Sequence, residues 1–212
     1  MKYIKNFIVG FLVSFVGSIP LGYLNFIGFE IYNKSNITEL IYYLLGVVIV
    51  EGIVISTTFY FANKLILNPK LKKWISIFSI MFLILIAIWF YPSDSKNPEN
   101  HNDSAAFLMY PSFIVGLILS SLNFAQIPFW FSWNIFLVNE KYILSDKNVP
   151  FVYVLGTLIG TFSGMLLLVL GLKKITHQGI ISDNFISNNI WIIFLVLAIF
   201  QIFQLYKGLK KN

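Results

Sequence analysis

One carboxylic acid lies deep within an apolar stretch of this sequence. Glu51 is the only charged residue between positions 40 and 63. An ionisable side chain in such surroundings tends to face an interior cavity and marks a functional site. Loss of water favours the protonated carboxyl over the carboxylate, so Glu51 is a candidate for taking up and releasing a proton. Thr58 shares its face two helical turns on. The alternative is a structural acid, hydrogen-bonded to a serine, threonine or asparagine of a neighbouring helix.

Two other apolar stretches carry a proline among polar and small residues. They are "GSIPLGYLNF" around Pro20 and "LNFAQIPFWF" around Pro128. Proline within a helix removes one amide donor and clashes with the carbonyl four residues back. The carbonyls of Val16 and Phe124 are therefore expected to be free. A helix that restarts at such a break points its amide end toward it, where an anion or carboxylate is attracted. The alternative is an ordinary proline kink, which membrane helices tolerate.

Polar and aromatic side chains around the two breaks are the candidate ligands for a small solute. Among them, Trp130 could wall a cavity or anchor its helix, and both interpretations stay open. No cysteine is present and both histidines fall in polar loops, so neither a metal site nor a cofactor is expected. No nucleophile–base pair is visible in the sequence, so an enzyme is not expected. The predicted solute-binding residues are Ser18, Pro20, Asn25, Asn123, Gln126, Pro128 and Trp130, with Glu51 as the proton-coupling residue.

The composition predicts an integral membrane protein. Of the 212 residues, 58% are hydrophobic and 11% are charged, whereas soluble domains carry roughly 25% charged residues. The lysines cluster at the ends of apolar segments, so a lipid bilayer is the expected partner and nucleic acid is not. A helix needs ~20 apolar residues to cross a bilayer. The segments that satisfy this are 6–29, 40–63, 74–93, 113–138, 148–172 and 184–206.

The lysines also predict the orientation of these spans. With the N-terminus in the cytoplasm, 11 of the 15 lysines fall on the cytoplasmic side and four on the other. This distribution follows the positive-inside rule. Both termini are therefore expected in the cytoplasm, with the chain in a bacterial cytoplasmic (inner) membrane.

A polar stretch, "PSDSKNPENHNDS", separates three predicted spans from three others. Because three is odd, the two sets must have opposite orientations, as in many secondary transporters. The expected fold class is an all-α integral membrane protein with six transmembrane helices in two inverted three-helix repeats, helices 1 and 4 being broken at Pro20 and Pro128. The first repeat spans 1–91, the extracytoplasmic linker 92–106 and the second repeat 107–212, all within one transmembrane domain.

Single residues match between the two repeats, although such matches also arise by chance. Span five in addition carries a stripe of glycines, which predicts close packing against another helix rather than a ligand site. The stripe consists of Gly156, Gly160 and Gly164, and the matched residues include Gly10 with Gly116, Ser14 with Ser120 and Gly46 with Gly156.

The first span also resembles a known family. "GFLVSFVGSIPLGYLNF" is similar to the first helix of the lysine-exporter (LysE-type) translocator superfamily, in which a small-residue-rich helix leads into a break with glycine, proline and asparagine. Pro20 and Asn25 correspond to that break, although "SIPLGYLN" replaces the compact family form. "LNFAQIPFWFSW" and "LGVVIVEG", around Glu51, resemble a divergent branch. The resemblance implies six helices in two halves and export of amino acids or related small solutes, driven by the proton gradient.

The expected function is therefore a secondary transporter that exports amino acids or related small solutes. Efflux of a cation or metal is an alternative, although one buried carboxyl without cysteine or buried histidine makes a poor metal site. A non-transporting scaffold subunit is another alternative, in which Glu51, Pro20 and Pro128 would be replaceable. The sequence specifies neither the solute nor the oligomeric state, and a homo-oligomer is compatible with it.

Overall fold

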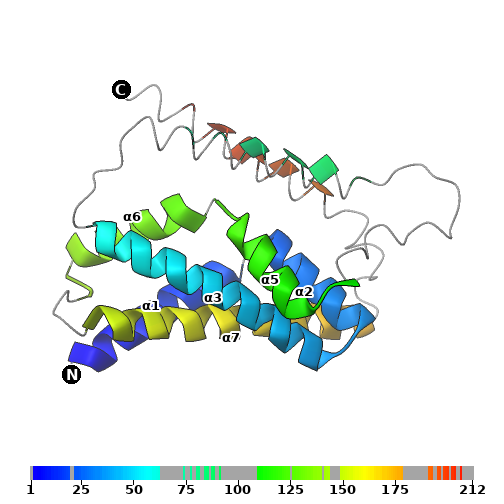
Figure 1. The fold of residues 1–212 in the computed structure, drawn as a ribbon, viewed down its shortest axis with the longest axis horizontal. Coiled ribbons are helices and arrows are strands. Elements are labelled where there is room, and N and C mark those ends of the chain that lie inside the picture. Colours follow the sequence, from blue (N-terminus) through cyan, green and yellow to red (C-terminus); the bar gives the residue numbers. More distant parts are fainter. Residues whose placement is uncertain are drawn as a thin grey trace, which may run out of the picture.

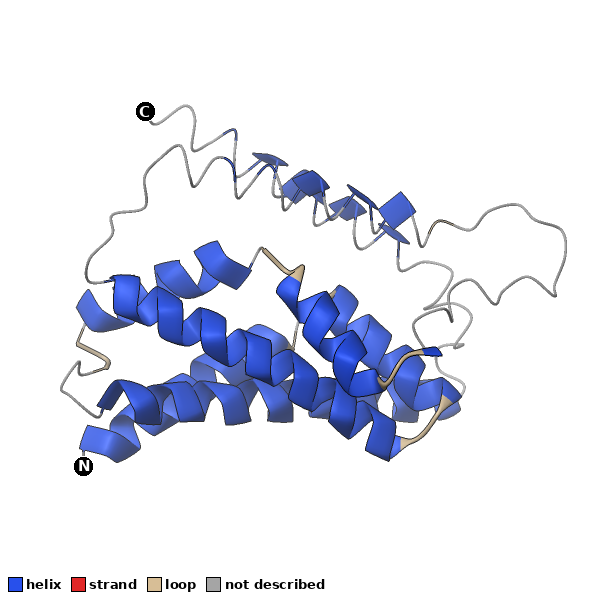
Figure 2. Ribbon diagram, viewed as in Figure 1, coloured by secondary structure: helices blue, strands red, loops and turns tan. Residues whose placement is uncertain are grey.

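The computed structural model is mainly helical in the part of the chain that it describes. No strand occurs among the described residues (Figure 2), which confirms the all-α class for them. The described residues are 2–19, 22–62, 109–124, 126–139, 141–143 and 149–178, together with single residues and short groups from 74–91 and 191–206.

The helices with described bounds are labelled as in Figure 1. They are α1 (Lys2–Ser18), α2 (Tyr23–Lys34), α3 (Ile37–Ala62), α5 (Ser112–Ser121), α6 (Gln126–Asn139) and α7 (Val149–His177).

Two of the described helices, α3 and α7, are long and apolar enough to cross a membrane. A third span results if α1 and α2 are counted together, since they form one bent pair with an angle of 76°. Helices α5 and α6 are apolar but shorter, so the predicted span 113–138 is two short helices instead of one long one. These apolar helices indicate a membrane protein. The predicted spans 74–93 and 184–206 fall largely outside the described residues.

The first break separates α1 from α2. Helix α1 ends at Ser18, and α2 begins after Gly22, whose backbone is extended. The amide of Ile19 donates to the carbonyl of Val16 at 3.4 Å, so the expectation that this carbonyl is free is wrong. The last turn tightens into a three-residue bond, as helix ends often do. Pro20 itself lies outside the described residues.

The second break lies upstream of Pro128, between Ser121 and Gln126. Pro128 is the third residue of α6, so the prediction that the helix breaks at this proline is wrong. Amides in the first turn of a helix have no partner within the helix, and a proline there costs no hydrogen bond. The carbonyl of Phe124, expected to be free, accepts a hydrogen bond from the amide of Ile127 at 3.2 Å.

Helix α1 lies along α7, and small residues bring the two backbones together (Figure 1). A Cβ atom added at Gly10 would lie 2.5 Å from the carbonyl oxygen of Tyr153. One added at Gly160 would lie 3.0 Å from the amide nitrogen of Phe15. The glycine stripe of α7 was predicted to serve close helix packing. This prediction is confirmed, and the helix packed against the stripe is α1.

Helices α3 and α5 also pack on each other through glycines, at the positions that match those of the α1–α7 interface. Gly46 and Gly116 lie at this crossing, each against the backbone of the opposite helix. A helix from one half thus packs on a helix from the other half in both interfaces. The matched contacts are Gly10 with the Tyr153 carbonyl and Gly116 with that of Tyr43, then Gly156 with the Phe7 carbonyl and Gly46 with that of Phe113.

Two clusters of buried hydrophobic side chains hold the helices together. One joins α2, α3, α5 and α7 and includes Tyr43 and Val169. The other joins α3, α6 and α7 and includes Ile55 and Leu137. On the outer face of α3, Ile53 is 63% exposed, which suits contact with lipid better than contact with water.

Candidate functional site

The Glu51 carboxyl lies where α3, α6 and α7 meet. The indole Nε1–H of Trp130, from the second turn of α6, donates to Glu51 Oε1 at 3.0 Å. The hydroxyl of Thr161, from the middle of α7, is hydrogen-bonded to the same carboxyl. Trp130 is 1% exposed and Thr161 3%, whereas Glu51 is only partly buried. One acid is therefore held by neutral donors from two neighbouring helices.

Thr161 extends these contacts to a fourth helix. Its Oγ1 is hydrogen-bonded to Oγ of Ser14 on α1, and either hydroxyl can be the donor. Ser14 is buried. We call Ser14, Glu51, Trp130 and Thr161 the Glu51 cluster. Its members come from α1 and α3 in the first half and from α6 and α7 in the second.

Both helix breaks are bridged by a side-chain amide. Asn25 Nδ2 donates to the carbonyl of Ser18 at 2.8 Å, across the first break. Gln126 Nε2 donates to the carbonyl of Ser120 at 2.8 Å, across the second. In each case a residue near the start of one helix donates its side-chain amide to a carbonyl at the end of the preceding helix, and the Ser120 carbonyl also accepts from the Asn123 amide.

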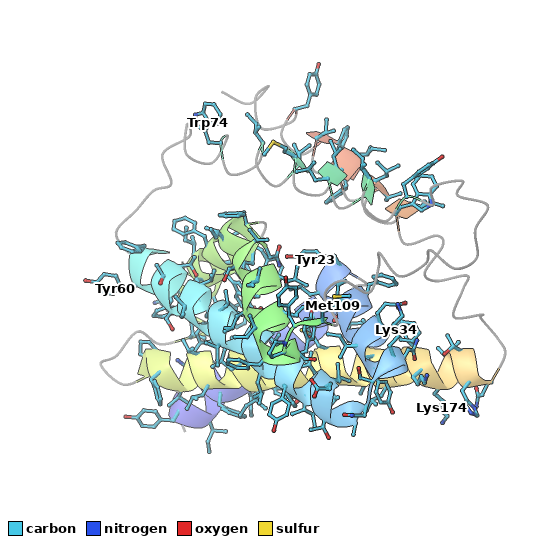
Figure 3. The ribbon with its side chains drawn as sticks, turned by 45° about the vertical axis from the view of Figure 1, so that its right-hand side comes forward. Tyr23, Lys34, Tyr60, Trp74, Met109 and Lys174 are labelled. Carbon is cyan, nitrogen blue, oxygen red and sulfur yellow. The ribbon has the colours of Figure 1, made fainter. Side chains whose placement is uncertain are left out.

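The two breaks and the Glu51 cluster are neighbours. Tyr23, which opens α2 and is labelled in Figure 3, donates its hydroxyl to the carbonyl of Leu119 in the last turn of α5 at 2.7 Å. Ser120 Oγ donates to the carbonyl of Val47 at 3.3 Å, one turn before Glu51 on α3. Polar groups from both halves therefore lie close together, at the two breaks and beside the middle of α3.

The structure places the other predicted solute-binding residues less centrally. Ser18 donates its hydroxyl to the carbonyl of Phe15 at 3.0 Å and lies against Gly164. Asn123 is half-buried in the second break, where its backbone amide donates to Ser120. Pro20 and the side chain of Pro128 lie outside the described part of the structure.

Sequence reasoning missed two members of the cluster, Ser14 and Thr161, as partners of Glu51. A signal for Thr161 was present, because the offset that matches Gly46 with Gly156 also matches Glu51 with Thr161. Thr58, expected on the face of Glu51, is instead bonded elsewhere.

A second buried polar group lies along the same three helices. Asn134, fully buried on α6, donates Nδ2–H to Thr58 Oγ1 at 3.0 Å and accepts from the hydroxyl of Tyr153 at 2.8 Å. The Thr58 hydroxyl in turn donates a hydrogen bond to the carbonyl of Val54 at 2.7 Å. This chain of hydrogen bonds ends at a backbone carbonyl, so it joins the helices but has no free group to carry a proton onward.

Asn134→Ala is expected to lower the free energy of unfolding by about 1–3 kcal/mol, because the buried Tyr153 hydroxyl loses its acceptor. Thermal unfolding of the purified protein in detergent measures the change. Tyr153→Phe in the Asn134→Ala background removes the orphaned hydroxyl and is expected to cost little more. An Asn134→Ala protein with wild-type stability would contradict this account of the α3–α6–α7 contact.

Charged side chains gather at the helix ends. At one end, Lys5 Nζ donates to the carbonyl of Lys141 at 3.1 Å. At the other end, Lys34 pairs with Glu30 at 3.0 Å, and Lys173 lies 5.9 Å from the ring centroid of Tyr32. Figure 3 shows Lys34 and Lys174 at this same end. Within the described ranges, no group of three or more histidine, cysteine, aspartate or glutamate side chains could hold a metal ion.

No family model, curated protein or solved structure matches this chain.

Proposed function

We propose that this protein is a secondary transporter that exports amino acids or related small solutes across the cytoplasmic membrane in exchange for protons. The observation that carries the proposal is the Glu51 cluster. It places one ionisable side chain among neutral donors, between helices of both halves and beside two helix breaks. An acid in such a position inside a membrane protein is characteristic of a proton relay.

The proposed architecture is six transmembrane helices in two inverted repeats, 1–91 and 107–212, related to the LysE-type superfamily. The matched helix interfaces support it. An internal two-fold relation requires every contact between the repeats to occur twice, with the roles of the halves exchanged. The glycine contacts of α1 with α7 and of α5 with α3 have this form.

The helix breaks supply the proposed solute site. The amide end of α2 carries no side-chain cap, since Gly22 occupies the N-cap position. Uncapped amides at a half-helix end attract the carboxylate of a bound solute. A solute between the breaks would exchange hydrogen bonds with the Asn25 and Gln126 amides, which otherwise bridge the breaks.

The lysine contacts support the proposed orientation. Lys5 and Lys141, both predicted on the cytoplasmic side, meet at one end. Lys34 and Lys173 are both predicted outside, and each contacts a residue of α2 at the other end. Lys34 pairs with Glu30, and Lys173 lies over the ring of Tyr32. The N-terminus then faces the cytoplasm, and both termini share that side.

Proton coupling follows if solute binds only when Glu51 is ionised. The carboxyl is protonated from the acidic outer side and loses its proton to the cytoplasm. The carboxylate state then accepts a solute for the return step. One proton enters for each solute that leaves, and the two repeats move against each other to alternate access.

An efflux assay tests the proposal. Purified protein is reconstituted into liposomes loaded with a mixture of amino acids, the outside is made acidic, and efflux is followed by mass spectrometry. We expect loss of one solute class that depends on the gradient and stops when a protonophore collapses it. Protein-free liposomes report the leak. If no amino acid or related solute leaves faster than the leak, the export proposal is wrong, and the scaffold alternative gains weight.

A further inference from the structure

The Glu51 cluster contains a hydroxyl pair whose hydrogen bonds have no fixed direction. Thr161 lies between the Glu51 carboxyl and Ser14, and the Ser14–Thr161 bond can run either way. Trp130 is different, because an indole only donates. The protonation state of Glu51 therefore decides the direction of the remaining bonds.

When Glu51 is ionised, its carboxylate only accepts hydrogen bonds. The Thr161 hydroxyl must then donate to it, which leaves the Thr161 oxygen to accept from the Ser14 hydroxyl. In this state the hydrogen of Ser14 is directed from α1 to α7, and the Ser14–Thr161 bond is the first link of a chain whose second bond, from Thr161 to Glu51, ends on a charge. Hydrogen bonds to charged groups are roughly twice as strong as neutral ones.

When Glu51 is protonated, its new O–H can donate to the Thr161 oxygen. The Thr161 hydroxyl then turns to the Ser14 oxygen, and the hydrogen of Ser14 needs another acceptor. In a helix, the acceptor within reach of a serine is the carbonyl four residues earlier, here Gly10. A serine that bonds back in this way often bends its helix. The bend would fall in α1 shortly before the first break.

We propose that Thr161 and Ser14 are positioning residues that transmit the protonation state of Glu51 to helix α1. Loss of the proton fastens α1 to α7 through Ser14, and gain of the proton turns Ser14 back onto α1. The inference rests on the proposed function, in which α1 carries the first solute-binding break. It makes Ser14 and Thr161 part of the coupling between proton and solute, although neither is predicted to bind either one.

The other charged side chains on the described helices lie near the helix ends. Helices α5 and α6 carry no titratable side chain, α1 carries none after Lys5, and the charged residues of α7 begin at Lys173. Glu39 lies in the first turn of α3. Among the buried tyrosines, Tyr153 is bonded to Asn134, Tyr23 to the Leu119 carbonyl and Tyr43 to the Leu24 carbonyl, and Glu30 is paired with Lys34.

The test follows two signals in the full-length protein in lipid nanodiscs. The first is the fluorine NMR shift of Trp130 after labelling with 5-fluorotryptophan, assigned with Trp130→Phe, which reports on Glu51 through their hydrogen bond. The second is the shift of a trifluoromethyl tag on Val16→Cys. The chain has no cysteine of its own, and Val16, at the exposed face of α1, is 63% exposed.

In the otherwise unaltered protein we expect both signals to change over one pH range with a common midpoint. In Thr161→Val the Trp130 signal should still titrate, while the tag on α1 loses its response. Thr161→Ser keeps the hydroxyl and should restore the response. Ser14→Ala is a second route to the same result if Thr161→Val does not fold. In Glu51→Gln neither signal should titrate.

The proposal is overturned if the tag still titrates with Trp130 in Thr161→Val or Ser14→Ala. It is also overturned if the tag never responds while Trp130 does, or if neither signal titrates in the unaltered protein. Neither signal requires a solute or a gradient. Loss of the coupling and failure of the export proposal therefore give different results, the first in these spectra and the second in the efflux assay.

Discussion

Glu51→Gln is expected to reduce gradient-driven efflux to the leak rate of protein-free liposomes. Glutamine has the shape of a protonated glutamic acid, so it can accept from Trp130 and donate to Thr161, and the protein should fold. It cannot ionise, and the cycle stops in the state that corresponds to bound proton. Efflux is measured by mass spectrometry at matched amounts of reconstituted protein.

Glu39→Gln is the matched control, because it removes an acid from the same helix at its first turn, away from the cluster. Efflux by this variant should equal that of the wild type. Thermal unfolding of both variants excludes a folding defect as the cause. Normal efflux by Glu51→Gln would keep the transporter proposal but remove Glu51 from the coupling.

Gly156→Ala is expected to abolish most of the folded protein. The added Cβ would collide with the carbonyl oxygen of Phe7 and lie 3.0 Å from its carbonyl carbon. These are backbone atoms, so no side-chain rotation relieves the clash and α1 must move as a whole. Overpacking typically costs about 1–3 kcal/mol when side chains can adjust, and we expect at least the upper end here. The measurements are the yield of monodisperse protein and its thermal unfolding.

Gly171→Ala tests the same substitution on the same helix where there is space. A Cβ at Gly171 meets nothing within 4 Å, and alanine is favoured over glycine in helices by roughly 0.5–1 kcal/mol. This variant should be as stable as the wild type or slightly more stable. Gly116→Ala, in the matched α3–α5 interface, should be as damaging as Gly156→Ala. Equal stability of all three variants would contradict the close backbone approach.

The position of Glu51 was predictable, but its full set of partners was not. A single acid within an apolar segment is recognisable from the sequence, and Trp130 was already a candidate because it follows a break. Periodicity within α3 shows that Thr58 shares a face with Glu51, yet it does not show which helix covers each part of that face. Thr58 is hydrogen-bonded to Asn134 of α6, whereas Glu51 is hydrogen-bonded to Thr161 of α7.

The breaks were predictable to within a few residues. Proline marks the second one only approximately, because Pro128 is tolerated in the first turn of α6 and the chain leaves α5 at Leu122. The effect of proline on a helix does not predict which side chains bridge the break. The amides of Asn25 and Gln126 close each gap from within the chain, at carbonyls that sequence reasoning did not single out.

The matches between the halves had a physical cause that only contacts reveal. Gly10 and Gly116 looked like isolated identities in apolar sequence. Each stands where the carbonyl of Tyr153 or Tyr43 passes too close for any side chain. The pairing itself, with each short helix packed on the long helix of the other half, was not predictable because residue spacing along one segment carries no information about its partner.

This exchange of partners sets the order in which the chain can acquire its fold. A ribosome delivers α1 to the bilayer long before α7 has been synthesised, so the glycine face of α1 must wait among lipids or other proteins for its partner. Helix α3, made early, likewise waits for α5. The packing of α1 and of α3 on their glycine-lined partners is therefore completed only after α7 and α5, which come later in the chain, have been made.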